Sequence, residues 1–251
     1  MAHGHQSGAK VDVAEHGAPR DGTPQTLHTR LFMQLLTCTC EPTPGSEHVA
    51  ETLRSALESG RVPGVLYADV QAPDGLALLS WSQDPAAFVD QVRPVFNQVA
   101  RACGVRTRSD MCMFGRTYSS GFETDLEYWL LRRPAETLTN PSWPWAVWYP
   151  LRRGGSFEKL EPREKGAIMR EHAMIGRAYG EADLAHDVRL ACHGLDTNDN
   201  EFVIGLVGRE LHPLSHVVQA MRSTRQTSEY ITQMGPFFVG KRLWALTPED
   251  A

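Results

Sequence analysis

A single histidine on the apolar side of an expected helix suggests two kinds of chemistry. Four residues of a helix predicted over residues 162–179 share one stripe, at spacings i, i+4, i+7 and i+11: Ile168, His172, Ile175 and Tyr179. A surface helix turns such a stripe toward the core. The imidazole of His172 is therefore either a buried group bonded to a backbone carbonyl or an axial ligand to a haem iron.

A second candidate group lies on a strand predicted over residues 187–193. Strand alternation places four side chains on one face, namely Asp187, Arg189, Ala191 and His193. An arginine stays charged at all working pH values and can hold a small anion or a carboxylate. The face that carries Arg189 is thus either a pocket wall or a solvated surface.

Composition narrows the class of protein that could carry these groups. Hydrophobic residues make up 41% of the 251 residues and charged residues 22%, as in soluble globular proteins. The net charge of −5 and the lack of a basic run argue against a nucleic-acid partner. No run of 18 apolar residues predicts a membrane span, and without a charged-then-apolar leader we expect a cytoplasmic protein.

The five cysteines are an odd number, and their spacing fits no zinc motif. We therefore expect packed free thiols at Cys38, Cys40, Cys103, Cys112 and Cys192.

Hydrophobic periodicity divides the chain into a tail, two halves and a linker. Residues 1–28 are rich in Gly, His, Ala, Pro and Asp without periodicity, and we expect a disordered tail. The N-terminal half, 29–120, predicts strands over 31–39, 64–71, 76–82 and 111–119, helices over 46–59 and 86–97, and a connector over 98–110. A linker follows over 121–145. The C-terminal half, 146–251, predicts strands over 146–151, 187–193, 201–207 and 236–246 and helices over 162–179 and 213–226.

The two halves repeat one order of elements. Residues 78–96 parallel residues 204–222 as strand, short loop and helix, with an arginine near the end of each helix. Each half therefore predicts a ferredoxin-like α+β unit, and the chain two fused repeats. Side by side they would form a large antiparallel sheet of roughly eight strands, with helices on one face. The other face would be free to line a pocket.

Four short motifs in the C-terminal part are similar to those of the chlorite dismutase and coproheme decarboxylase family of haem proteins. They are WYPLRR at 148–153, REHAMIGRAY at 170–179, the loop GLD at 194–196, and MR at 221–222 followed by GPFFVG at 235–240. The resemblance covers most of the chain after the tail. It implies two ferredoxin-like halves, a haem held by the second half, and a ring of five subunits.

The resemblance assigns roles to four residues. His172 matches the proximal histidine that binds the iron, and Pro150 stands 22 residues earlier, as in the family. Arg153 takes the place of a lysine that pairs with a haem propionate, a charge that a guanidinium can supply. Tyr149 matches the radical tyrosine of the decarboxylases, with a hydrogen-bonded core tyrosine as the alternative. Arg189 matches the distal arginine of the dismutases, where decarboxylases have glutamine or histidine.

Two departures concern the surroundings of the haem. The family places a glutamate that bonds the far nitrogen of the proximal histidine in a region that here reads Arg225 to Glu229, and Glu229 is out of step by about one helical turn. Phe157 and Glu158 replace a tryptophan pair of the dismutases. A weaker acceptor would make the imidazole a poorer electron donor.

The resemblance implies a haem-dependent oxidoreductase with haem b or coproheme as cofactor. The chain combines the decarboxylase tyrosine with the dismutase arginine. From the resemblance we expect it to carry out peroxide-dependent coproheme decarboxylation, a step of haem biosynthesis. One alternative is decomposition of chlorite, a small oxyanion, to chloride and dioxygen at Arg189. Another is a carrier or sensor that binds haem through His172 without turnover. A third is a fold used for assembly without haem.

Overall fold

A computed structural model describes residues 11–43 and 45–247. In the N-terminal half, buried apolar residues recur with strand and helix periods in the predicted order. The elements are β3 (Phe32–Thr39), α1 (Ser46–Ser59), β4 (Gly64–Asp69), β5 (Gly75–Ser82), the π-helical turn η1 (Phe88–Val92), α2 (Arg93–Cys103), β6 (Arg106–Thr107), the 3-10 turn η2 (Ser109–Met111) and β7 (Met113–Thr117).

The helix expected over 86–97 is longer than predicted. It runs on to Cys103 because Phe96, Val99 and Cys103 keep the helical spacing and stay buried. Gly104 then ends it in a left-handed conformation, with φ at 67°. The connector expected over 98–110 is therefore mostly helix and short strand.

The C-terminal half confirms the predicted order and adds two short elements near its end. Its elements are β8 (Trp145–Arg153), the 3-10 turn η4 (Phe157–Lys159), α4 (Pro162–Glu181), β9 (His186–Ala191), β10 (Phe202–Gly208), α5 (Leu211–Met221), the π-helical turn η5 (Gln226–Tyr230), β11 (Ile231–Met234) and β12 (Phe238–Leu246). The helix expected over 213–226 ends earlier, at Met221.

The prediction of a disordered tail over residues 1–28 is wrong for the part that the structure describes. Strands β1 (Glu15–Arg20) and β2 (Thr23–Leu27) form a hairpin. Its turn uses Asp21 and Gly22, both at positive φ, as two-residue hairpin turns require. The Glu15 carboxylate accepts a hydrogen bond from Arg116 Nη1 at 3.0 Å, which ties the hairpin to β7. Residues 1–10 lie outside the described residues.

The linker expected over 121–145 also carries helical structure. It contains the π-helical turn η3 (Tyr128–Arg132) and helix α3 (Arg133–Thr139). Leu126, Leu130 and Leu138 are buried, and Leu138 belongs to the cluster that includes Trp148 and Val188. The segment thus forms one wall beside β9 rather than an open crossing between the halves.

The large antiparallel sheet is closed, which corrects the expectation of a free second face. Its strand order is β10-β9-β7-β3-β5-β4-β12-β8-β11, and a further pairing joins β10 to β8. With β6 and β11 attached at the outside, eight of the ten strands form a ring. The inside of an eight-stranded barrel has room for little more than its own side chains. Here it is filled by buried residues such as Met33, Trp81 and Trp148.

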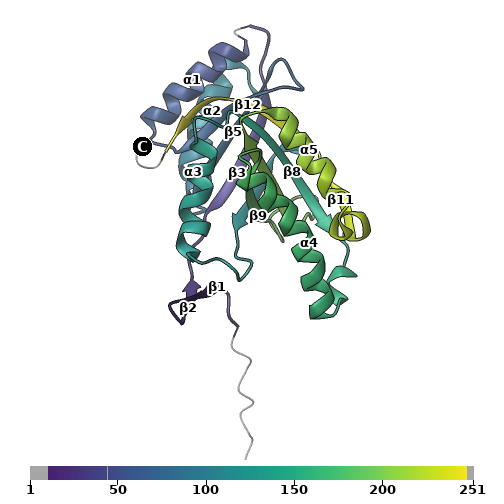
Figure 1. Ribbon diagram of the computed structural model, residues 1–251. Coiled ribbons are helices and arrows are strands. Elements are labelled where there is room, and N and C mark those ends of the chain that lie inside the picture. The colour runs from purple at the N-terminus through teal and green to yellow at the C-terminus, as the bar shows by residue number, and fades with distance from the viewer. Residues whose placement is uncertain (1–10, 44, 248–251) are drawn as a thin grey trace, which may run out of the picture.

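The helices lie on the outside of this barrel (Figure 1). Helices α1 and α2 cover the N-terminal half over a buried apolar cluster that includes Leu53 and Phe96. Helices α4 and α5 cover the C-terminal half over a cluster that includes Val147 and Leu214. Any pocket of the C-terminal half must therefore lie between the helices and the outer face of the barrel.

All five cysteines are free thiols, and four of them are buried, as expected. Within the described part of the chain, no helix combines the length and the apolar character that crossing a membrane needs.

Candidate functional site

Helix α4 carries His172 and packs loosely on the barrel. Pro162 starts the helix at its first turn, where a missing N–H costs nothing. Among its 20 residues, all of which the structure describes, Ile168 alone is buried, whereas the 14-residue α1 buries Val49, Leu53 and Leu57. The stripe of α4 is thus directed at the barrel, with Ile168 buried and with Ile175 and Tyr179 only partly buried against the apolar cluster below.

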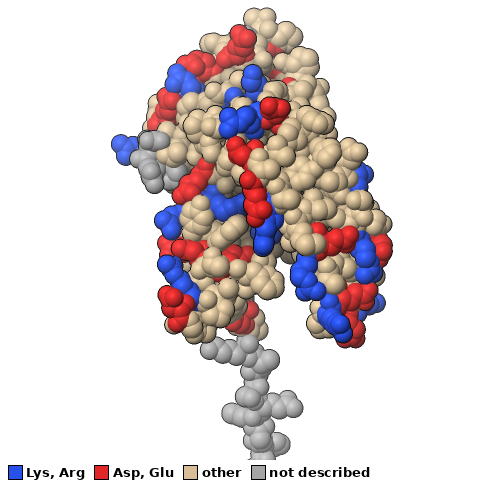
Figure 2. Space-filling view, in the orientation of Figure 1, with Lys and Arg blue, Asp and Glu red and all other residues tan. Residues whose placement is uncertain are grey.

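The surface is hollowed beside this helix. Figure 2 shows a deep notch between the limb that ends in α4 and the limb that carries α3. The apolar residues below, including Ile204, Met234 and Phe237, are only partly buried. An amphipathic helix over a partly uncovered apolar face leaves room for a flat apolar group.

The outer face of the barrel presents Tyr149 and Arg189 in one row. In the strand register, Ile204 of β10 pairs with Tyr149 of β8 on one side and with Arg189 of β9 on the other. Directly paired residues of a sheet point to the same side. Tyr149 and Arg189 therefore face α4 together, about 10 Å apart at two strand spacings. The next row holds Leu206 and Asp187 in the same way.

His172 meets this face from the helix. Its Nδ1 atom is buried and has no hydrogen-bond partner among the described residues. Burial lowers the pKa of the imidazole, and the positive charge of Arg189 lowers it further. The ring is therefore neutral at pH 7 and lies close enough to Arg189 to feel its charge. A neutral imidazole is the form that ligates a metal.

Arg189 is held by a carboxylate on its own strand. Its Nε lies 2.9 Å from Oδ2 of Asp187, and each of the two side chains is 39% exposed. Burial is nevertheless the largest effect on the pKa of both groups. Arg189 also lines a small cavity, so its guanidinium is only partly open to water.

Tyr149 is buried and stacks on Phe237, with ring centroids 4.6 Å apart. Burial raises the pKa of its phenol, Asp187 adds to the rise, and Arg222 opposes it. The phenol is therefore protonated at neutral pH and can give up a hydrogen atom or donate a hydrogen bond.

Arg153 reaches the same end of the cleft but is paired within the protein. Its guanidinium lies 3.4 Å from Glu201 and 3.5 Å from Glu158. The rings of Phe157 and Phe202 flank it at 4.5 Å and 4.7 Å. The expected role of Arg153 toward a propionate requires an unpaired guanidinium. In this structure the guanidinium is already paired with two glutamates.

Two residues near the site were missed by the sequence reasoning. Arg222, at the end of α5, is exposed and close enough to Tyr149 to affect its pKa. Gln226 in η5 has a buried Oε1 without a partner in the described part of the chain. The MR motif at 221–222 could have pointed to Arg222, whereas nothing in the sequence marks Gln226 as buried.

Glu229 does not serve His172. It pairs with Arg225 on its own turn, at 3.2 Å. The main-chain nitrogen of Arg225 in turn donates to Glu171 at 3.2 Å, which joins the residues beside Gln226 and His172. Glu229 is thus engaged on its own turn, and the expectation that it is out of step with the family's glutamate stays a prediction.

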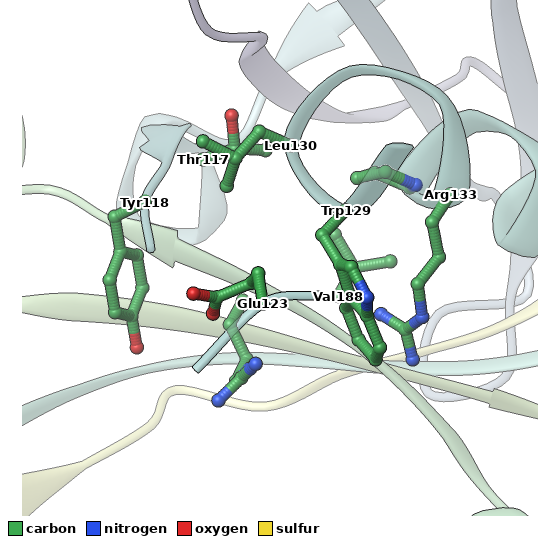
Figure 3. A pocket seen from close by; sticks show the side chains of 9 residues that line it. Thr117, Tyr118, Glu123, Trp129, Leu130, Arg133 and Val188 are labelled. Atoms are coloured by element: carbon green, nitrogen blue, oxygen red, sulfur yellow. The ribbon is translucent and has the colours of Figure 1, made fainter. Parts of the chain in front are cut away.

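A small cavity adjoins Arg189. It has a volume of about 20 Å³ and is lined by residues that include Tyr118, Glu123, Trp129 and Arg133. Figure 3 shows Glu123 between Tyr118 on one side and Trp129 with Arg133 on the other. This is room for about one water molecule. A larger groove of about 480 Å³ lies between β3, β7 and α2, and Arg93 is the one charged residue of its lining. The small cavity, in contrast, is lined by three charged residues, Glu123, Arg133 and Arg189.

The donor set suits a haem better than a bare metal ion. No group of three or more His, Cys, Asp or Glu side chains that could hold a metal exists among residues 11–43 and 45–247. A haem iron needs only one or two protein ligands, because the macrocycle supplies four. His172, with a partly uncovered apolar face opposite, fits that need.

A sequence profile described as chlorite dismutase matches residues 77–243. The chain belongs to the chlorite dismutase family. No curated protein matches the chain significantly.

Solved structures share the fold of this chlorite dismutase family member at low sequence identity. A protein assigned as a chlorite dismutase is similar at a TM-score of 0.70 and 15% identity, over 86% of this chain and 96% of that one. A novel heme-binding protein from Thermus thermophilus is similar at 0.65 and 19%, over 88% and 93%. A mutant chlorite dismutase from Candidatus Nitrospira defluvii is similar at 0.63 and 14%, over 89% and 94%. These likenesses confirm the expected α+β fold.

Proposed function

We propose that this member of the chlorite dismutase family is a haem-dependent oxidoreductase that uses hydrogen peroxide to decarboxylate coproheme. One observation carries the proposal. His172 on α4 is directed across the cleft at the barrel face whose row holds Tyr149 and Arg189. A macrocycle between them would have a ligand on one side and reactive groups on the other.

The residues of the cleft divide into holding and reacting groups. His172 would ligate the iron, and its lowered pKa keeps it neutral for that role. Arg222, exposed at the end of α5, has no hydrogen bond or ion pair from its side chain within the described residues, and is the cation best placed to meet a propionate. Arg153 would bind a second propionate only if that propionate replaced Glu158 as its partner. The similarity to a heme-binding protein from Thermus thermophilus supports a haem in this cleft.

The bound haem would supply one-electron oxidation driven by peroxide. Tyr149, buried and protonated, would give up the hydrogen atom of its phenol and then take one from the β-carbon of a propionate. Arg189 would orient peroxide or a carboxylate through its guanidinium. Overall, one propionate and one hydrogen peroxide give a vinyl group, one carbon dioxide and two waters, so atoms and electrons balance.

The test is to load the protein with coproheme without oxygen, add peroxide stepwise and measure the mass of the extracted porphyrin by mass spectrometry. The proposal predicts loss of carbon dioxide and two hydrogen atoms per propionate consumed. Tyr149→Phe, which keeps the stacking on Phe237, should retain binding and lose this reaction. An unchanged porphyrin mass in the wild-type protein would reject decarboxylation.

A second candidate is a haem carrier or sensor without turnover. It is favoured by the unpartnered Nδ1 of His172, because a histidine without an acceptor is a weaker electron donor to iron. Slow reaction of the haem-loaded protein with peroxide, together with reversible transfer of haem to a stronger haem-binding protein, would support it.

Assembly as a ring of five subunits remains a proposal from the family resemblance, as does a cytoplasmic location. The mass of the haem-loaded particle in solution, measured by light scattering, tests the ring.

A further inference from the structure

The charges around Arg189 balance. Two guanidinium groups, of Arg189 and Arg133, stand with two carboxylates, of Asp187 and Glu123. Glu123 is tied by hydrogen bonds from Ser120 and Gly121 and lies close enough to act on the pKa of Arg189. These two positive and two negative charges cancel next to Arg189, whereas an isolated arginine would leave its immediate surroundings positive.

Asp187 is the carboxylate that touches Arg189. Its Oδ2 forms an ion pair with Nε of Arg189 at 2.9 Å, and its Oδ1 accepts a hydrogen bond from Nη2 of Arg133 at 3.0 Å. Nη1 of Arg133 also donates to the main-chain oxygen of Asp187 at 2.9 Å, and its guanidinium lies 4.5 Å above the ring of Trp129. Helix α3 thus fixes Asp187, and Asp187 fixes the orientation of Arg189.

The pair stays ionised at neutral pH. Burial raises the pKa of Asp187, but Arg189 and Arg133 together outweigh it and bring the pKa below its ordinary value. Burial likewise lowers the pKa of Arg189, and the carboxylate of Asp187 reverses this. A fixed negative charge in contact with the guanidinium cancels most of the field that would attract an anion.

We propose that Asp187 is a specificity-determining residue, which makes the site accept neutral hydrogen peroxide in preference to small anions such as chlorite. The inference rests on the proposed haem-dependent function. Removing the carboxylate would leave Arg189 uncompensated and raise the affinity for anions, while neutral ligands would feel no such change.

The experiment titrates the ferric haem-loaded protein at about pH 8.5 with azide, an anion, and with imidazole, which is largely neutral at that pH. Asp187→Asn should raise the affinity for azide at least fivefold and change the affinity for imidazole less than twofold. Asp187→Glu keeps the charge, and Asp90→Asn removes an exposed carboxylate from η1 in the other half. Asp187→Glu should tighten azide binding less than Asp187→Asn does, and Asp90→Asn should stay within twofold of the wild type for both ligands. The ratio of the rate constants for chlorite and for peroxide should rise at least tenfold in Asp187→Asn.

The outcomes separate this inference from the proposed function. Unchanged azide affinity in Asp187→Asn, or equal tightening of azide and imidazole, overturns the role of Asp187 and leaves haem binding intact. Absence of a haem spectrum in the wild-type protein overturns both.

A measurement on the wild-type protein covers the case in which Asp187→Asn does not fold. Cancellation of the charge of Arg189 by Asp187 predicts that azide affinity changes less than twofold between low and high ionic strength. Severalfold weakening by salt would show an anion-attracting site and contradict the proposal.

Discussion

At the scale of single residues, the imidazole of His172 and the amide of Gln226 are complementary groups left unpaired. Nδ1 of one and Oε1 of the other are both buried without partners in the described residues. Turn η5 packs on α4, and the Arg225–Glu171 hydrogen bond joins their direct neighbours. A carboxylate in place of Gln226 would therefore add a buried acceptor on the turn that packs against α4.

We predict that Gln226→Glu makes the bound haem harder to reduce. A charged acceptor increases the electron donation of the histidine and stabilises the ferric state. The midpoint potential should fall by about 59 mV, the equivalent of a tenfold change for one electron. Spectroelectrochemistry measures it. Glu229→Gln, which loses only the pair with Arg225, should leave the potential unchanged.

The pH dependence of stability gives a second prediction at this scale. The pKa of His172 is lowered in the folded protein by burial and by Arg189, so the unfolded chain binds its proton more readily. The stability of the haem-free protein should thus be full above the ordinary pKa of about 6.5 and fall as the pH drops below it, by at most about 1.4 kcal/mol per pH unit. Urea unfolding at about pH 7.5 and pH 5.5 measures this. His172→Gln should reduce the loss, whereas His48→Gln on the exposed side of α1 should not.

At the scale of elements, α4 has one fully buried side chain, Ile168, besides the partly buried Ile175 and Tyr179. We expect Ile168→Ala to destabilise the haem-free protein by about 2–5 kcal/mol, the usual cost of a core truncation. It should also weaken haem binding, because Ile168 helps to set the position of His172 over the cleft. Chemical denaturation measures the first effect and haem titration the second. Ile168→Val should cost about 0.5–1.5 kcal/mol, and equal stability of all three proteins would refute this role of Ile168.

Elements could be predicted from the sequence where their hydrophobic pattern lies within a few neighbouring residues. The α4 stripe and the alternation of β9 lie within a few residues, so the sequence placed His172 on the inner side of its helix and Arg189 and Asp187 together. The β1–β2 hairpin was missed because its strands lack apolar alternation and are held by contacts with residues a hundred positions away, such as Glu15 with Arg116. The pairing of Asp187 with Arg133 on α3 was missed for the same reason.

At the scale of the whole molecule, closure of the barrel decides where the site lies. The repeat of elements predicted an antiparallel sheet, but no local pattern encodes that β10 pairs with β8 and closes the ring. Closure turns Trp148 and its neighbours inward and leaves the face with Tyr149 outward, under α4.

The point where β8 meets β10 tests this closure. Gly205 pairs with Trp148, and a Cβ at Gly205 would lie 2.5 Å from the indole ring. Gly205→Ala should therefore destabilise the protein by about 1–3 kcal/mol through overpacking. Gly155→Ala, where a Cβ would meet nothing within 4 Å, should stay within about 0.5 kcal/mol of the wild type. Thermal unfolding compares the three, and equal melting temperatures would contradict the packed interior.

The central claim is that His172 ligates a haem iron from α4. The most direct measurement is a titration of the haem-free protein with ferric coproheme, followed by absorption spectroscopy, for the wild type and for His172→Ala. With His172 as the ligand, the wild type should show a saturable Soret band with the features of imidazole ligation, and His172→Ala a shifted band with weaker binding. Identical spectra and affinities for the two proteins would contradict this role of His172.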